Sequence, residues 1–218
     1  MDIDIARHIG AVTRRVETRT RDGESVYVIR AERTFDTPLD DAWDAITNPE
    51  RLPRWFLPVT GDFRPGGSFR IEGNASGEIL RCEPPEELGV TWVFNEQVSW
   101  VDVFLTAEGD EGTRLVLEHL APVDPEFQAR YGPGAGGVGW EQAFMGLDLH
   151  LATGESVDPG AVAAWGASAE GAAFVEASSE AWGHAAIAAG TDAEEAHAAA
   201  RRTTDFYTGA EEAGVEED

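Results

Sequence analysis

The stretch that decides the fold is VYVIRAERTFDTPLDDAWDAITNPERLPRWF, residues 26–56. Its first ten residues alternate like a β-strand that runs to Phe35. Thr37-Pro38 then predicts the start of a helix, with Thr37 as the cap and Pro38 at the first helical position. Asn48-Pro49 predicts the end of that helix, and a short turn of helix should follow from Arg51 to Phe56.

A β-meander is predicted downstream, and a hairpin upstream. Residues 11–35 alternate around Asp22-Gly23, a pair that favours a hairpin turn. Strand-like runs separated by short Gly, Pro and Asn turns follow, about ten residues apart. This spacing favours an antiparallel meander over βαβ units. The expected strands are 58–64, 67–73, 76–83, 88–94, 97–107 and 112–120.

The rest of the chain is predicted to be helical. Trp140, Phe144, Leu147 and Leu151 recur at helical spacing. We expect the glycine-rich residues 132–139 before them to form a flexible lead into that helix. Two more helices are predicted over 168–189 and 191–207.

Charge and composition exclude several classes of protein. The 218 residues include 41 acidic side chains and 16 Arg but no Lys, for a net charge of −25. We therefore expect neither nucleic acid nor an anionic membrane surface as a partner. No run reaches the length of a membrane span and no secretory signal is visible, so a cytoplasmic protein is expected. The single cysteine, Cys82, excludes an internal disulfide framework and is expected to be buried filler.

The charge is concentrated at the end of the chain. Residues 154–218 hold 14 acidic residues, 2 Arg and 20 Ala, so they carry −12 of the total. We divide the chain into an amino-terminal arm with an added strand (1–25), a central domain (26–153) and an Ala-rich acidic helical extension (154–218).

The central domain resembles the START-like (SRPBCC) helix-grip superfamily, and within it the Aha1-like group of activator of Hsp90 ATPase homologues. The resemblance is carried by the opening stretch and, in order, by PGGSFRI (65–71), TWVF (91–94), GTRLVLEHL (112–120) and GWEQAFMGLDLHLA (139–152). It implies an α+β helix-grip fold, in which a curved antiparallel sheet wraps round the long helix and leaves a cavity. The superfamily binds lipids, hormones and polyketides in that cavity.

The resemblance and the alternation together give candidate ligand contacts. Trp55 and Phe56 should close the cavity from the short-helix side, as a lid or as plain core. Glu141 and Asp148 lie seven residues apart and so share a helix face. The full candidate set is Trp55, Phe56, Phe69, Trp92, Val101, Val103, Leu117, His119, Glu141, Phe144, Met145 and Asp148.

His119 is the most informative polar candidate. It should point inward and either bond a ligand or pair with Glu141 or Asp148 as a satisfied core histidine. No catalytic residue is assigned. The five His show no metal spacing, and no phosphate-binding or dinucleotide fingerprint appears, so we expect no metal and no cofactor.

The strand over 97–107 is apolar on both faces, with Trp100 and Phe104 on the outer one. A sheet with one solvated face should not show this. We therefore expect the tail, or a second subunit in a homodimer, to cover the outer face.

Three functions remain open. The first is the binding of a small hydrophobic molecule without catalysis. The second is a co-chaperone-like interaction module, although the sequence shows no counterpart of the additional amino-terminal domain of Hsp90 activators. The third is an aromatase or cyclase that uses His119 with Glu141 or Asp148 as an acid–base pair.

Overall fold

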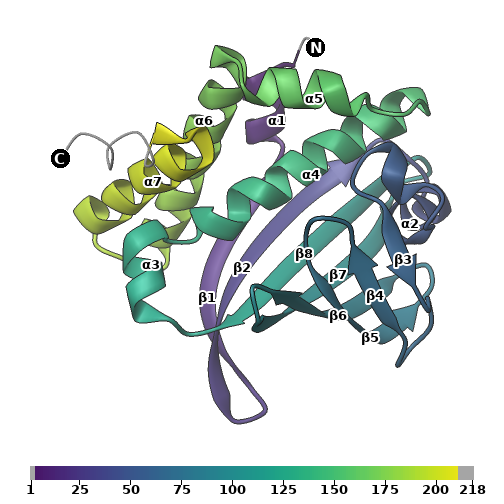
Figure 1. The fold of residues 1–218 in the computed structure, drawn as a ribbon, viewed down its shortest axis with the longest axis horizontal. Coiled ribbons are helices and arrows are strands. Elements are labelled where there is room, and N and C mark those ends of the chain that lie inside the picture. Colours follow the sequence, from purple (N-terminus) through teal and green to yellow (C-terminus); the bar gives the residue numbers. More distant parts are fainter. Residues whose placement is uncertain (1–2, 211–218) are drawn as a thin grey trace.

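A computed structural model describes residues 3–210. Eight strands form one antiparallel sheet in the order β1-β2-β8-β7-β6-β5-β4-β3 (Figure 1). The meander and the amino-terminal hairpin are therefore both confirmed, and Asp22 and Gly23 turn the hairpin at positive φ. The strands are β1 Thr13–Arg21, β2 Glu24–Phe35, β3 Val59–Gly61, β4 Ser68–Ile71, β5 Ser76–Glu83, β6 Glu87–Phe94, β7 Gln97–Glu108 and β8 Gly112–Pro122.

The long helix α4 crosses the concave face of the sheet, as the helix-grip expectation requires (Figure 1). The predicted helix after the first strand is α2, which begins at Leu39, one residue later than expected. Within residues 3–210, no helix combines the length and apolarity of a membrane span. The helices are α1 Ile5–Gly10, α2 Leu39–Thr47, the 3-10 helix η1 Leu52–Arg54, α3 Pro125–Tyr131, α4 Gly134–Thr153, α5 Pro159–Gly166, α6 Ala169–Ala188 and α7 Ala193–Thr208.

The glycine-rich segment is helix, so the expected flexible lead is wrong. α4 begins at Gly134 and includes residues 134–139, whereas Gly132 ends α3 at positive φ. The reason is close packing, because a Cβ at Gly137 would lie 2.2 Å from Cε2 of Trp182 on α6. Glycine therefore lets the indole lie directly against the helix backbone.

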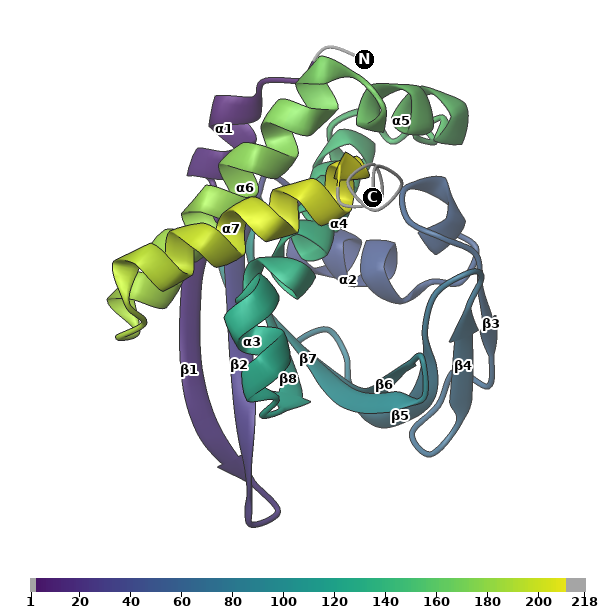
Figure 2. The same ribbon diagram turned by 60° about the vertical axis from the view of Figure 1, so that its left-hand side comes forward.

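The tail packs on the same side of the sheet as α4. α6 contacts α4, α1 and the edge strand β1, and α7 contacts α6, α3 and α4 (Figure 2). Trp182 is fully buried in the same core cluster as Phe35 and Leu147. Strand β1 widens the sheet at one edge, and α6 packs against it.

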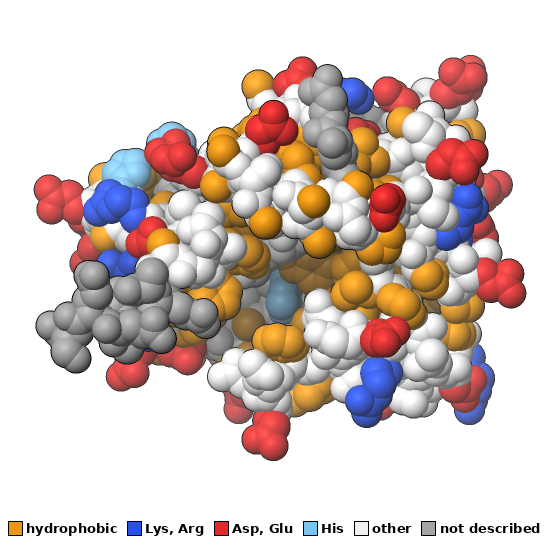
Figure 3. Space-filling model, turned by 45° about the horizontal axis from the view of Figure 1, so that its top comes forward, with side chains coloured by type: hydrophobic (Ala, Val, Ile, Leu, Met, Phe, Trp, Pro, Cys, Tyr) orange, Lys and Arg blue, Asp and Glu red, His pale blue; other side chains and the backbone are white. Residues whose placement is uncertain are grey.

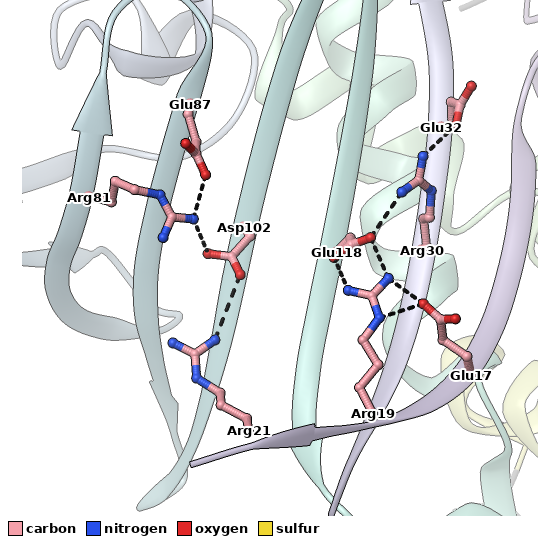
Figure 4. A network of polar contacts seen from close by, with 9 residues as sticks. All are labelled: Glu17, Arg19, Arg21, Arg30, Glu32, Arg81, Glu87, Asp102 and Glu118. Atoms are coloured by element: carbon pink, nitrogen blue, oxygen red, sulfur yellow. Dashed lines mark hydrogen bonds and ion pairs between the residues drawn. The ribbon is translucent and has the colours of Figure 1, made fainter.

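The expected cover of the outer face by the tail is therefore wrong. That face instead carries a network of Arg and carboxylate side chains (Figure 4). Arg19 and Arg30 both bond Glu118, whose side chain is only 7% exposed. The guanidinium of Arg21 lies 4.5 Å from the ring centroid of Trp100. The Arg21 side chain thus covers part of the apolar outer face.

Candidate functional site

An apolar cavity of about 340 Å³ lies between α4, α2, η1 and the concave face of strands β3 to β8. Figure 3 shows a hollow with hydrophobic side chains gathered around it. The size falls at the lower end of ordinary small-molecule sites. The cavity is lined by Trp43, Ile46, Thr47, Leu52, Trp55, Phe56, Val59, Phe63, Phe69, Ile71, Ile79, Cys82, Leu88, Val90, Trp92, Val101, Val103, Leu115, Leu117, Trp140, Ala143, Phe144 and Leu147.

Strand alternation and helix periodicity determine which side chains face the cavity. Val101 lies opposite Val90 in the β6–β7 pair, and Val103 lies opposite Leu117 in the β7–β8 pair, so all four face the same side. On α4, Trp140, Phe144 and Leu147 recur at i, i+4 and i+7 and face the sheet. Phe144 meets Phe35 of β2 edge to face, with ring centroids 5.9 Å apart.

Several polar groups on the wall are bonded within the protein. The Thr47 hydroxyl donates to the carbonyl of Trp43 at 2.7 Å. The indole Nε1 of Trp55 donates to the carbonyl of Ala45 at 2.9 Å. No charged side chain is among the lining residues. A ligand carboxylate or phosphate would therefore lose its hydration without gaining a partner.

Cys82 also lies on the cavity wall. It is a free, partly buried cysteine. Burial raises the pKa of its thiol. The thiol is therefore held in its neutral form and adds no charge to the cavity.

His119 is not among the lining residues, but it contacts two lining tryptophans, Trp92 and Trp140. Its Nδ1 accepts a hydrogen bond from Nε1 of Trp140 at 3.1 Å, and its Nε2 lies 2.9 Å from the hydroxyl of Ser99. An indole N–H can only donate, so Nδ1 carries the lone pair and Nε2 carries the proton. Ser99 in turn donates to the carbonyl of Trp92 at 3.0 Å. Both nitrogens of a neutral imidazole are thus occupied.

Burial explains why this histidine stays neutral. It lowers the pKa of His119 to about 4. The ring centroid lies 5.8 Å from that of Trp140 and 6.3 Å from that of Trp92. At neutral pH, His119 therefore serves to fix the two tryptophan rings that line the cavity.

The two carboxylates of α4 share a face as predicted, but neither pairs with His119. Glu141 is 3% exposed, and Arg14 of β1 binds both its oxygens at 2.6 and 2.7 Å. Asp148 is held by Arg33 of β2 at 2.7 Å, and His8 of α1 lies 3.8 Å away. Neither residue is among the lining side chains, because both face the added strand and α1. The expected pairing of His119 with either carboxylate is therefore wrong.

The remaining candidates divide clearly. Met145 belongs to a second apolar cluster with Ile3, Trp165 and Phe174, so it faces α1 and the tail. The candidates that do lie at the cavity wall are Trp55, Phe56, Phe69, Trp92, Val101, Val103, Leu117 and Phe144.

Sequence reasoning missed part of the wall. Trp43 and Ile46 come from α2, and Trp140 and Ala143 come from α4. The signal was present, since Trp43 and Ile46 form the apolar stripe of the predicted helix after Pro38. The apolar stripe of an amphipathic helix beside a cavity forms part of the cavity wall.

Within residues 3–210, no three His, Cys, Asp or Glu side chains gather closely enough to hold a metal ion. The structure does bring two distant histidines together. His184 of α6 and His197 of α7 meet with ring centroids 5.8 Å apart. We see no further ligand beside them.

A family model described as "Activator of Hsp90 ATPase homolog 1-like protein" matches residues 36–152, more than half of the chain. The chain belongs to this family. The match includes α2, the meander and nearly all of α4, which are the elements that enclose the cavity. No protein with a curated description matches the sequence.

Solved structures extend the similarity. The crystal structure of CalU16 from Micromonospora echinospora is 34% identical, with a TM-score of 0.62, and the match covers 81% of this chain and 99% of that one. In the solution structure of CalU16 the match is 30% identical, with a TM-score of 0.62, and covers 94% of this chain and 97% of that one. Residues 154–218 are 65 of 218, so a match of 94% must include tail residues.

A third structure supports the fold alone. PFC0360w, described as an HSP90 activator from Plasmodium falciparum, is 22% identical with a TM-score of 0.50. The match covers 59% of this chain and 96% of that one. Together with CalU16 it agrees with the helix-grip fold of an α+β protein.

Proposed function

We propose that the protein binds an uncharged hydrophobic small molecule in the cavity between the sheet and α4. The observation that carries this proposal is the apolar cavity of about 340 Å³, in which no lining side chain is charged and the Thr47 hydroxyl and Trp55 indole N–H are bonded within the protein. Apolar surface that contacts a ligand contributes about 25 cal/mol per Å² removed from water. Shape complementarity and apolar contact therefore supply the affinity, and a charge on the ligand lowers it.

The same geometry disfavours acid–base catalysis. A general base must reach the proton that it abstracts, and its pKa should lie near the working pH. His119 has a pKa lowered to about 4 and bonds on both nitrogens. Glu141 and Asp148 are bound by arginines away from the wall. The aromatase or cyclase alternative thus has no pair of groups to carry it.

Two probes with one aromatic frame test the proposal. N-phenyl-1-naphthylamine is neutral, and 1-anilinonaphthalene-8-sulfonate is the same frame with a fixed negative charge. We expect the neutral probe to bind in a saturable way and the sulfonate to bind at least tenfold more weakly. Native mass spectrometry of protein from its source should also find a co-purifying apolar molecule. Equal binding of the two probes would contradict the proposed selectivity.

Variants that fill the cavity separate specific from surface binding. Ala143→Phe adds a ring inside the cavity, where Ala143 contributes to the wall. Ala152→Phe makes the same change at an exposed position of the same helix. We expect Ala143→Phe to weaken binding of the neutral probe at least tenfold and Ala152→Phe to leave it within twofold. If neither variant lost binding, the probe would be bound outside the cavity.

The family description favours a second candidate, a co-chaperone-like protein interaction. Its test is the ATP turnover of Hsp90 in the presence of the full chain. Stimulation that survives Ala143→Phe would favour this candidate over the cavity, whereas no stimulation would remove it.

A further inference from the structure

The first turns of α4 have little helix stability of their own. Residues 134–139 read GAGGVG, and Pro133 before them offers no side-chain cap. Glycine is the poorest helix former after proline, so the four glycines together leave these turns with little intrinsic helix stability. These turns must therefore be held by packing.

The tail supplies most of that packing. A Cβ on Gly137 would lie 2.2 Å from the Trp182 ring of α6. A Cβ on Gly134 would lie 3.1 Å from Cγ2 of Thr203, and one on Gly139 would lie 3.1 Å from the Tyr207 hydroxyl, both on α7. Three of the four glycines thus form the surface on which α6 and α7 rest.

Hydrogen bonds from α7 strengthen this contact. The Tyr207 hydroxyl donates to the carbonyl of Ala135 in α4 at 2.8 Å. The Thr203 hydroxyl donates to the carbonyl of Tyr131 in α3 at 2.7 Å. Arg202 donates to the carbonyls of two further α3 residues. Helix α7 therefore bridges α3 and the start of α4 (Figure 2).

The same turns lead directly into the cavity wall. Trp140 follows Gly139, and its ring centroid lies 5.1 Å from that of Trp92 on β6. On the sheet side, a Cβ at Gly136 would lie 3.0 Å from Cδ1 of Ile29. The glycine-rich turns are thus held between the tail and the sheet, next to a tryptophan that faces the ligand cavity.

We propose that α6 and α7 form a strap that holds residues 134–139 helical and so closes the cavity beside Trp140. Docking of the strap and occupancy of the cavity then stabilise each other. This inference rests on the proposed ligand binding. Because such coupling is reciprocal, a bound ligand favours the docked tail, and release of the tail weakens ligand binding.

Gly137→Ala tests the strap sharply, because two effects predict opposite results. Helix propensity alone would stabilise α4. A Cβ pressed against Trp182 instead displaces the strap. We expect faster amide hydrogen exchange over 134–143 and 169–208, and a dissociation constant for N-phenyl-1-naphthylamine about tenfold higher. Gly166→Ala is the matched control, since a Cβ at that end of α5 meets open space.

Tyr207→Phe is the milder second variant, used also if Gly137→Ala does not fold. It keeps the ring and removes only the bond to Ala135, so exchange over 134–139 should rise. Unchanged exchange over these residues in both variants overturns the strap. Faster tail exchange with a probe dissociation constant within twofold of wild type also overturns it, and leaves ligand binding standing. A wild-type protein that does not bind the probe contradicts the ligand proposal, while the exchange data still decide whether the strap holds α4.

Discussion

The buried ion pair between Arg14 and Glu141 joins the added strand β1 to α4, and its removal should be costly. The two side chains are 9% and 2% exposed. Arg14→Met leaves the Glu141 carboxylate buried without its partner, and such a loss typically costs 3–5 kcal/mol. Arg14 also donates to the carbonyls of Ile9 at the end of α1 and of Val12 just before β1, so this connection loses two bonds as well.

The double variant Arg14→Met/Glu141→Met separates the charge from the packing. It removes both ions and keeps an apolar side chain of similar length at each position, and such replacements are often neutral or stabilising. We expect it to recover about 2 kcal/mol or more of the loss. The measurement is urea unfolding followed by circular dichroism, with the slope checked for a common two-state transition.

Arg64→Met provides the control for this prediction. Arg64 pairs with Asp62 at 2.8 Å, but the side chains are 68% and 55% exposed. Exposed pairs contribute about 0–1 kcal/mol, so this change should cost little. A double variant less stable than Arg14→Met alone would refute the reasoning, because the carboxylate would then not be the source of the cost.

Two further predictions concern titratable groups. Burial lowers the pKa of His119 to about 4, below its ordinary value of 6.5, so the unfolded chain binds the proton first. Stability should therefore fall by roughly 1–3 kcal/mol as the pH drops from 6.5 to 4, and His119→Gln should flatten that slope while His184→Gln, at an exposed position, should not. Burial also raises the pKa of the Cys82 thiol, so N-ethylmaleimide should react more slowly with it than with free cysteine at pH 7.5, as read from intact mass. Bound N-phenyl-1-naphthylamine should slow the reaction further, and a rate that ignores the probe would show that the ligand does not reach this wall.

The order of elements could be predicted from sequence because its signals are local. Alternation and short turns located every strand of the meander, and Asn48 ends α2 as expected. The short helices α1, α3 and α5 were missed, since six to eight residues give too little periodicity to separate helix from loop.

The errors about Glu141, Asp148 and the glycines of α4 have another cause, which is contact between residues far apart in the chain. The partners of Glu141 and Asp148 are Arg14 and Arg33, more than 100 residues away, and no local pattern connects them. The glycines of α4 indicated flexibility because the Trp182 indole that Gly137 accommodates comes over 40 residues later in the chain. Eight of the twelve candidate site residues lie at the cavity wall, since strand alternation and helix periodicity decide which way they face.

Four of the seven tryptophans, Trp43, Trp55, Trp92 and Trp140, line the cavity. The fluorescence of an indole depends on the groups that contact its ring. A molecule that enters the cavity should therefore change the intrinsic fluorescence spectrum of the unlabelled protein. Trp182, buried against α4, lies outside that group and senses the tail instead. The protein thus contains its own optical sensor, and single tryptophan replacements could tell filling of the cavity from movement of the tail.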